Sequence, residues 1–289
     1  IGPTIVYDAE RCILCTRCVR FCDEVAKDSV LSKRDRGNLS EIVLAPGRQL
    51  DHPYSLMTEF VCPVGALTAV DFRFKARVWF LRRARTICPG CATGCNAYLD
   101  YDPRNQTVYR HQPRENLAVN RYWMCDEGML CYRRVHENRV LGARRKGKDT
   151  RPRKALRAAV KRLSDVPAEA FGVVLSGQHS QEDNYALLEL ARGLGVQQVF
   201  ISGKPEGEGD DILRDPDKNP NTGGVEELCG ERAPKQMVEL SKAVGDGEVT
   251  HVLALGGDTT DAEGVAALQG LKQLIVLATH EGPLVELAT

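Results

Sequence analysis

The sequence predicts an α/β protein in which a cysteine-rich first half precedes a parallel-sheet domain. Of the eleven cysteines, all but Cys229 lie before residue 132. Beyond residue 154, short apolar runs alternate with segments of helical spacing. Strands that alternate with helices of this length are typical of βαβ units, and therefore of a parallel, Rossmann-like sheet.

Composition limits the classes of function. The chain has 289 residues, with 39 basic and 39 acidic side chains, so its net charge gives no reason to expect a polyanionic partner. Its longest apolar runs, such as "LIVLA" at 274–278, fall far short of the roughly 20 residues of a membrane span. No secretory signal is visible, and the start at Ile1 suggests a piece of a longer protein.

The first cysteine group has the spacing C-x2-C-x2-C at Cys12, Cys15 and Cys18. Such a triplet can place three thiolates around one face of an iron–sulfur cube and leave the fourth iron for a distant cysteine. A structural zinc site usually pairs two C-x2-C knuckles, and the second knuckle is missing here. Disulfides between such near neighbours would close very small loops and stabilise little. An iron–sulfur cluster is therefore the favoured interpretation.

The fourth ligand of this group is either Cys22 or Cys62. In the bacterial ferredoxin run, the cysteine three positions after the triplet serves a second cluster and is followed by proline. Cys22 is followed by Asp23, whereas Cys62 is followed by Pro63, and no second triplet lies near Cys62. We therefore expect Cys62 to complete the first set, with Cys22 as an unligated core thiol.

The second group has the spacing C-x2-C-x3-C at Cys88, Cys91 and Cys95. Gly90 and Gly94 let the backbone fold back toward the ligands and direct N–H groups at sulfur. The fourth ligand must come from position 125, 131 or 229. Cys125 is preferred because "DEG" after it suggests the start of a helical turn, and Cys131 is its rival. Two clusters in one chain most simply transfer single electrons.

The chain is expected to contain three segments, at 1–83, 84–140 and 141–289. A loop is expected at 33–59, and a basic linker at 139–154. Strands are expected at 97–102, 107–112, 171–177, 196–202, 251–257 and 273–279, and helices at 153–163, 180–195 (with Ser180 as N-cap), 235–247 and 262–271.

Once these motifs are identified, the chain resembles the large iron–sulfur subunit of respiratory complex I, the NADH-quinone oxidoreductase. The resemblance covers nearly the whole chain. It rests on "YDAERCILCTRCVRFCDEV", "CPVGALT", "FRFKARVWFLRRARTICPGCATGCN", "RYWMCDEG" and "DPDKNPNTGG".

The resemblance implies two [4Fe–4S] clusters. The first would be bound by Cys12, Cys15, Cys18 and Cys62. The second, off the main electron path, would be bound by Cys88, Cys91, Cys95 and Cys125. A [2Fe–2S] cluster and a further [4Fe–4S] cluster with one His ligand would belong to a part of the subunit missing from this sequence.

The implied fold is α/β: an N-terminal [4Fe–4S] ferredoxin-like segment, a small cluster-binding β subdomain, and a Rossmann-like parallel α/β domain of the molybdopterin oxidoreductase type. No molybdopterin is expected. Where substrate-handling enzymes of that fold often have a lysine two positions after the fourth cluster cysteine, this chain has Glu127. Cys229, in "EELCGER", is expected in a polar loop.

The implied function is electron transfer in the peripheral arm of complex I, without a catalytic acid, base or nucleophile. The partners would be the flavin- and NADH-binding subunit and the quinone-side iron–sulfur subunits, with no nucleic acid. The location would be peripheral, at the cytoplasmic face of the bacterial plasma membrane, reached only through partners. The alternatives are a truncated molybdenum or tungsten formate dehydrogenase, a relay subunit of a soluble NAD-reducing hydrogenase, and a zinc scaffold.

Other features have plain interpretations. "GKPEGEGDD" at 203–211 is expected to be a solvated loop, and "LALGGDTTD" at 253–261 a vestigial nucleotide-binding turn. The six histidines lack ligand spacing and are expected at the surface or in packing. The basic stretch at 73–85 could dock an acidic partner, raise a cluster potential or be a solvated face.

Overall fold

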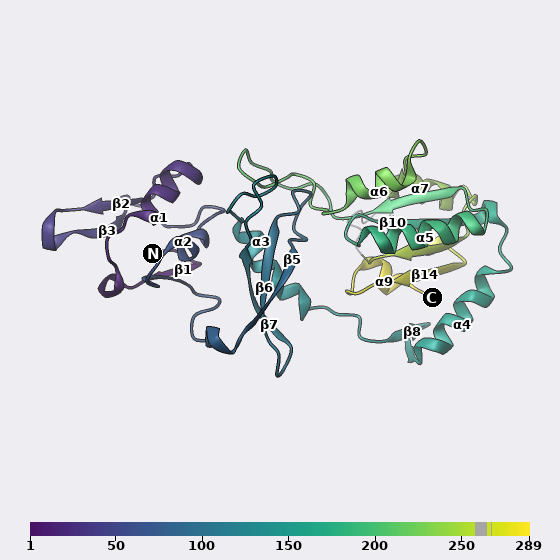
Figure 1. Ribbon diagram of the computed structural model, residues 1–289. Helices are drawn as coiled ribbons and strands as arrows, with labels where there is room; N and C mark the ends of the chain where they lie inside the picture. Colours follow the sequence, from purple (N-terminus) through teal and green to yellow (C-terminus); the bar gives the residue numbers. More distant parts are fainter. Residues whose placement is uncertain (258–264, 267) are drawn as a thin grey trace. The chain divides into compact units, whose positions relative to one another are not determined.

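The computed structural model describes residues 1–257, 265–266 and 268–289 (Figure 1). They form two compact units, one of residues 1–136 with 208–215, the other of residues 137–207 with 216–289. We call the first the cysteine-rich unit and the second the α/β unit. The expected segment boundaries after residues 83 and 140 stay predictions. The turn expected at 253–261 and the helix expected at 262–271 fall partly outside the described residues.

The first cysteines lie between a strand and a short helix of the cysteine-rich unit. Strand β1 (Ile5–Tyr7) pairs antiparallel with β4 (Leu67–Ala69), which brings the start of the chain beside the segment that follows Cys62. Helix α1 (Arg17–Arg20) continues into a π-helical turn at Phe21–Val25.

The segment 33–59, expected to be a loop, contains regular structure. Strands β2 (Leu31–Arg34) and β3 (Glu41–Leu44) form an antiparallel hairpin, and helix α2 (Met57–Val61) follows. The expectation is wrong because the glycines and prolines of this segment lie in the connections between these elements, not within them.

A three-stranded antiparallel sheet follows. It consists of β5 (Arg82–Ile87), β6 (Asn96–Asp102) and β7 (Thr107–Pro113), which confirms the two strands expected here. The buried carboxylate of Asp100 accepts hydrogen bonds from the Nε atoms of Arg83 at 2.7 Å and Arg110 at 2.9 Å. The short helix α3 (Asp126–Leu130) comes next along the chain.

One hydrophobic core joins both cysteine-bearing segments of this unit. Its fully or almost fully buried members come from both segments: Ile5, Leu31, Leu50, Met57, Ala97, Met124 and Met129. The rings of Phe21 and Trp123, from the two segments, pack with centroids 5.1 Å apart. The two expected cluster segments therefore do not have separate cores.

Residues 208–215 also belong to the cysteine-rich unit, although they come late in the sequence. The buried hydroxyl of Tyr54 donates to the carboxylate of Asp210 at 2.9 Å. An unpaired buried hydroxyl would cost about 1–3 kcal/mol, so this contact stabilises the arrangement. The expectation of a solvated loop at 203–211 is wrong for Asp210, since its partner, a tyrosine far away in sequence, could not be inferred from the local acidic composition.

The α/β unit is built on a five-stranded parallel sheet (Figure 1). Its strands are β10 (Phe171–Ser176), β11 (Gln198–Ser202), β12 (Lys235–Gln236), β13 (His251–Leu255) and β14 (Gln273–Leu277). Their order is β12-β11-β10-β13-β14. This order, which runs outward from the first strand in one direction and then in the other, is the doubly wound arrangement, so the predicted parallel sheet is confirmed.

Helices cover both faces of this sheet. They are α5 (Gln181–Gly193), α6 (Thr222–Cys229), α7 (Met237–Gly245) and α9 (Pro283–Leu287). On one face Val174 and Phe200 pack with residues of α7 and α9, while on the other Val173 and Leu175 pack with α5 and α6. Burial on both faces explains why the strands are continuously apolar. Among the described residues, no helix has the length and apolar character needed to cross a membrane.

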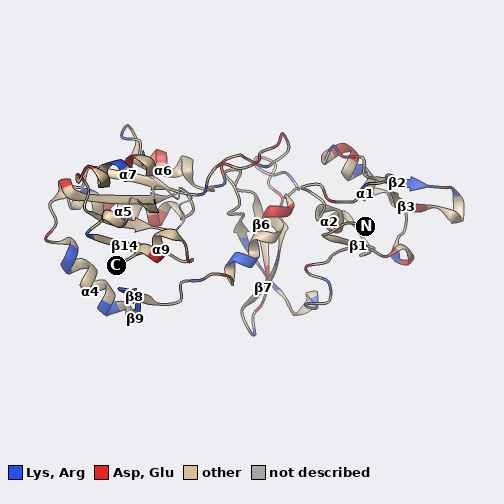
Figure 2. Cartoon of the chain, turned by 180° about the vertical axis from the view of Figure 1, so that it is seen from behind, with Lys and Arg blue, Asp and Glu red and all other residues tan. Residues whose placement is uncertain are grey.

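The basic stretch at 139–154, expected to be a linker, is ordered structure. Strands β8 (Ala143–Arg145) and β9 (Lys148–Thr150) form a hairpin, and helix α4 (Pro152–Leu163) begins two residues later. Lys146 and Gly147 make the turn with φ of 50° and 71°. Two positive φ values suit a tight hairpin turn. The linker expectation is wrong because the high local density of charge gave no indication of this turn. Figure 2 draws the Lys and Arg residues of these elements in blue.

Replacing Phe200 by alanine should destabilise the α/β unit. Phe200 is fully buried, and removing such a ring typically costs about 3–5 kcal/mol. Urea denaturation followed by circular dichroism should show a lower midpoint for unfolding of this unit. Tyr185→Ala is the control, because Tyr185 is half-exposed on α5 and should change stability little. Equal midpoints for the two variants would contradict the assigned core.

Candidate iron–sulfur sites

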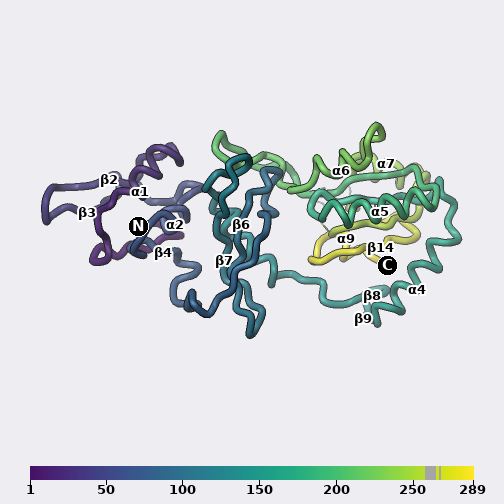
Figure 3. The backbone as a smooth tube through the Cα atoms, viewed as in Figure 1, coloured from purple at the N-terminus to yellow at the C-terminus, as the bar shows by residue number. Residues whose placement is uncertain are grey.

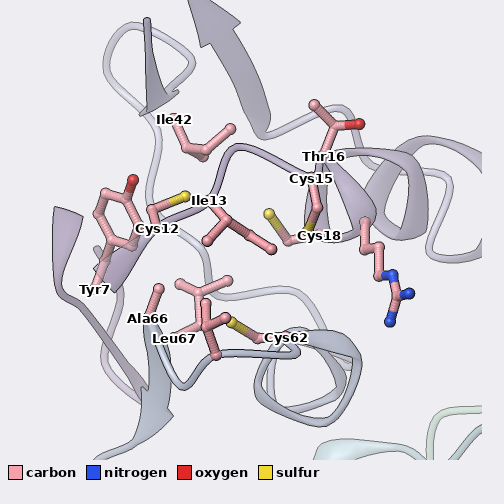
Figure 4. A pocket seen from close by; sticks show the side chains of 12 residues that line it. Tyr7, Cys12, Ile13, Cys15, Thr16, Cys18, Ile42, Cys62, Ala66 and Leu67 are labelled. Atoms are coloured by element: carbon pink, nitrogen blue, oxygen red, sulfur yellow. The ribbon is translucent and has the colours of Figure 1, made fainter. Parts of the chain in front are cut away.

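Four cysteines of the cysteine-rich unit line one cavity. Cys12, Cys15 and Cys18 come from the loop between β1 and α1 and the start of α1, and Cys62 comes from the end of α2. Figure 4 shows their side chains around a common space. The remaining lining is mostly apolar, with side chains of Tyr7, Ile13, Ile42, Val64, Ala66 and Leu67. The structure thus brings together all four side chains expected for the first cluster.

The backbone of this loop is strained at two residues between the cysteines. Leu14 has φ of 55° and Thr16 has φ of 59°, in the left-handed region that non-glycine residues rarely occupy. Such residues cluster at functional sites, where the surrounding structure compensates for the strain. The amide of Leu14 also donates to Cys12 Sγ at 3.4 Å. Sequence reasoning missed this conformation, because leucine and threonine do not favour it.

Cys62 ends helix α2. Its backbone is extended, with φ of −75° and ψ of 115°, as expected for a residue that precedes proline. Pro63 therefore stops the helix at the point where the thiol meets the other three.

Cys22 and Cys229 lie outside the cavity lined by the first group. Cys22 is fully buried, with its Sγ 3.5 Å from Nε2 of His52, and burial raises its pKa to about 12. Cys229 is the last residue of helix α6 and packs partly buried against the α/β core. The expectation of a polar loop at Cys229 is wrong, because the glutamates before it are on the exposed side of a helix.

The second cysteine group is buried around a tight loop. Cys88, Cys91, Cys95 and Cys125 are each at most 8% exposed. The amide of Cys88 donates to the carbonyl of Cys95 at 2.8 Å and closes the loop, and Gly94 turns the chain with φ of 59°. Contact with Cys131 and burial raise the pKa of Cys88, and a hydrogen bond from the backbone of Gly90 acts in the other direction, as expected from the glycine positions.

Cys125 and Cys131 use their sulfurs differently. Cys125 is the N-cap of α3, and its Sγ accepts the N–H of Gly128 at 3.3 Å. Cys131 Sγ instead donates to the carbonyl of Gly128 at 3.0 Å and lies 3.2 Å from Nδ1 of His111 and 4.0 Å from Cys88 Sγ. An accepting sulfur suits a thiolate ligand, and a donating one a protonated thiol. Sequence reasoning missed the contact of His111 with Cys131, because His111 lies on β7 and has no ligand-like spacing from the cysteines.

Asp126 connects the two groups. Its carboxylate accepts the N–H of Leu56 at 2.8 Å, at the start of the turn that leads to Cys62, and its own N–H donates to the carbonyl of Pro53 at 2.7 Å. Burial raises its pKa to about 7, although backbone hydrogen bonds from Leu56 and Ser55 act in the other direction. Sequence reasoning also missed this role, because the partners are backbone groups far away in sequence.

The chemistry of both sites suits iron and sulfur. All eleven cysteines are free thiols. Burial raises the pKa of Cys18 to about 11 and of Cys125 to about 12, so metal binding must release protons. Within the described residues, no three His, Cys, Asp or Glu side chains are arranged to hold a single metal ion. The thiols of the first group lie around a cavity and not around a point, which is compatible with a cube that has an iron at each of four corners.

Two segments of the chain match known families. Residues 2–68 match the ferredoxin-like domain of NADH-quinone oxidoreductase subunit 3, and residues 81–137 match the molybdopterin oxidoreductase Fe4S4 domain. These matches cover both cysteine groups and support [4Fe–4S] clusters in this chain. Together with the parallel sheet, they confirm the predicted fold class.

Curated relatives point the same way. An NADH-quinone oxidoreductase subunit of Mycobacterium bovis is 31% identical over 215 residues, which is 71% of this chain and 26% of the relative. Subunit 3 of the same enzyme from Thermus thermophilus is 30% identical over 208 residues, 71% of this chain and 26% of the relative. The mitochondrial NADH dehydrogenase [ubiquinone] iron-sulfur protein 1 of Solanum tuberosum is 31% identical over 208 residues, which is 70% of this chain and 28% of the relative.

The comparisons confirm the predicted resemblance to the large iron–sulfur subunit of NADH-quinone oxidoreductase. The matched region spans about a quarter of the length of these relatives.

Gly128→Ala should damage the second site selectively. A Cβ at position 128 would lie 3.0 Å from Cys88 Sγ and 3.2 Å from Met124 Cε, in a buried region that cannot yield freely. Iron and acid-labile sulfide per chain should fall by up to half, and the EPR signal of one reduced cluster should weaken. Gly142→Ala, where an added Cβ meets nothing within 4 Å, should keep both. Equal iron content in both variants would contradict this packing.

The contrast between Cys125 and Cys131 gives a second prediction. Cys125→Ser should abolish one of the two cluster signals, because the sulfur proposed as the fourth ligand of the second cluster is lost. Cys131→Ser should retain that signal with a modest change in line shape, because a serine hydroxyl can still donate to Gly128. EPR of the two dithionite-reduced variants checks this prediction. Loss of the signal in Cys131→Ser and its retention in Cys125→Ser would identify Cys131 as the ligand.

Proposed function

We propose that this chain is an electron-transfer iron–sulfur subunit in the peripheral arm of an NADH:quinone oxidoreductase, relaying single electrons from the NADH and flavin side toward quinone. The single observation that carries the proposal is the apolar cavity in which three thiols of one loop meet the thiol of Cys62. The similarity to relatives named for this enzyme complex supports the same conclusion.

Two [4Fe–4S] clusters are proposed. The first is bound by Cys12, Cys15, Cys18 and Cys62. The second is bound by Cys88, Cys91, Cys95 and Cys125. Cys22 and Cys131 are proposed to stay thiols, since Cys22 does not line the first cavity and Cys131 donates its proton to a carbonyl. Clusters in the part of the subunit outside this sequence would complete the relay.

The chain's own residues hold the clusters and control access to them. When bound, a [4Fe–4S] cluster accepts and returns one electron at a time. In the first site Cys15 is exposed and Ile13 beside it is 61% exposed, so this site reaches the surface. The second group is buried throughout. We infer that the first cluster exchanges electrons with partner subunits and that the second lies off the main path.

The proposed partners are the flavin- and NADH-binding subunit and the quinone-side iron–sulfur subunits. The proposed location is peripheral, at the cytoplasmic face of the bacterial plasma membrane, with contact to the membrane only through these partners. No nucleic-acid partner is proposed.

The match of residues 81–137 to a molybdopterin oxidoreductase Fe4S4 domain raises one further candidate, a molybdopterin enzyme such as a formate dehydrogenase, which the named relatives do not favour. Glu127, in the first turn of α3, argues against it. Burial raises the pKa of Cys125, and the negative charge of Glu127 raises it further. The same charge would oppose an anionic pterin. Molybdenum or tungsten in the purified protein would favour the enzyme over the relay.

EPR of the dithionite-reduced protein tests the proposal. The parent should show two cluster signals. Cys62→Ala should remove the signal of the first cluster and leave the second, because its ligands come from other elements. Cys22→Ser is the matched control and should keep both signals. If Cys62→Ala leaves both signals intact, the first ligand set is wrong; if the parent shows no iron–sulfur signal, the relay itself fails.

A further inference from the structure

Residues 208–215, which we call the strap, join the cysteine-rich unit from a distant part of the sequence. The chain leaves the α/β unit between β11 and α6, forms the strap, and returns. In Figure 3 the connection that contains it is the green segment beside the blue strands of the cysteine-rich unit. Ile212 and Leu213 of the strap pack against the core that includes Cys88, Cys95 and Cys125.

Asp210 gives the strap its shape and its anchor. Its Oδ1 accepts the N–H groups of Ile212 and Leu213 at 2.9 Å and of Arg214 at 3.1 Å, and the Nε of Arg214 donates to Oδ2 at 2.9 Å. Burial alone would raise the pKa of Asp210, but these N–H groups lower it to about 2. The carboxylate also accepts the buried hydroxyl of Tyr54 at 2.9 Å, which fixes the strap to the cysteine-rich unit.

Leu213 contacts the loop of the second cysteine group directly. Thr93, between Cys91 and Cys95, donates its hydroxyl to the carbonyl of Leu213 at 2.5 Å. Cys91 Sγ lies 3.5 Å from the same hydroxyl oxygen. A hydroxyl has one proton to donate, so a proton given to Leu213 is withheld from the sulfur.

We propose that the strap is a positioning element of the second cluster site, which keeps water and the Thr93 hydroxyl proton away from Cys91 and so holds that cluster at a low reduction potential. This inference rests on the proposed second cluster. The potential of such a cluster depends on hydrogen bonds to its sulfurs and on exposure to solvent. A cluster that lacks both is harder to reduce, so loss of the strap raises the potential.

The test is a potentiometric titration of the full chain followed by EPR, with the first cluster as internal reference. Asp210→Ala and Leu213→Ala should shift the midpoint of the second cluster to a more positive value and speed its loss to an iron chelator severalfold. The first cluster should keep its midpoint, which also reports that the unit has folded. Asp210→Asn retains Oδ1 as an acceptor and should restore most of the parent value.

Thr93 separates the hydrogen-bond effect from general loosening. Thr93→Val in the parent should leave the midpoint of the second cluster almost unchanged, because the hydroxyl does not donate to Cys91. In the Asp210→Ala background, Thr93→Val should remove part of the positive shift, which gives a coupling between the two sites. A negative shift from Thr93→Val alone would mean that the hydroxyl already serves the sulfur and would overturn the proposed role of Thr93.

Glu206→Ala is the matched control, because it removes an exposed carboxylate four positions before Asp210. It should change neither the midpoint nor the rate of loss. If Asp210→Ala and Leu213→Ala keep the parent midpoint and rate of loss, or if both clusters shift their midpoints equally, the proposed role of the strap is wrong. The proposed function would remain intact. Absence of a second cluster in the parent would overturn the strap together with the second ligand set, whereas the first cluster would still support the relay.

Discussion

The cysteine-rich unit depends on the hydrogen bonds around Asp126. Its carboxylate holds the backbone at Leu56, and its amide holds Pro53, so the helix that ends at Cys62 and the helix capped by Cys125 are fixed against each other. Each cysteine triplet can form its loop locally, but the fourth thiol of each set must arrive from elsewhere. The half-buried carboxylate of Asp126, next to Cys125, therefore also fixes the backbone that leads to Cys62.

The two sites differ in the backbone features that bring their thiols together and in their exposure to solvent. The first uses left-handed backbone at Leu14 and Thr16 and remains open to the surface beside Ile13. The second uses glycines, the close packing of Gly128 on Cys88 and a cover from a distant segment, and it is closed to solvent. An open site suits electron exchange with another protein, whereas a closed one suits a cluster whose surroundings are fixed by the chain itself.

Much of this architecture could be predicted from sequence, for physical reasons. The strands at 171–176 and 251–255 are apolar on both faces, so the parallel sheet was visible. The cysteine spacings identified the two groups, because ligand geometry constrains the number of residues between them. The features that could not be predicted are those that lack a clear local pattern or that depend on residues far away in the sequence. The β2–β3 hairpin is short and largely exposed, and the partners of Asp126 and Asp210 are far away in sequence.

The late position of residues 208–215 has a consequence for biogenesis. A ribosome delivers the chain from its N-terminus, and domains generally fold as they emerge. Here the hydroxyl of Tyr54 must wait for Asp210, so the earlier unit stays unfinished until much of the α/β unit has been synthesised. Completion of the core around the second cysteine group is thereby tied to translation of a segment that carries no cysteine.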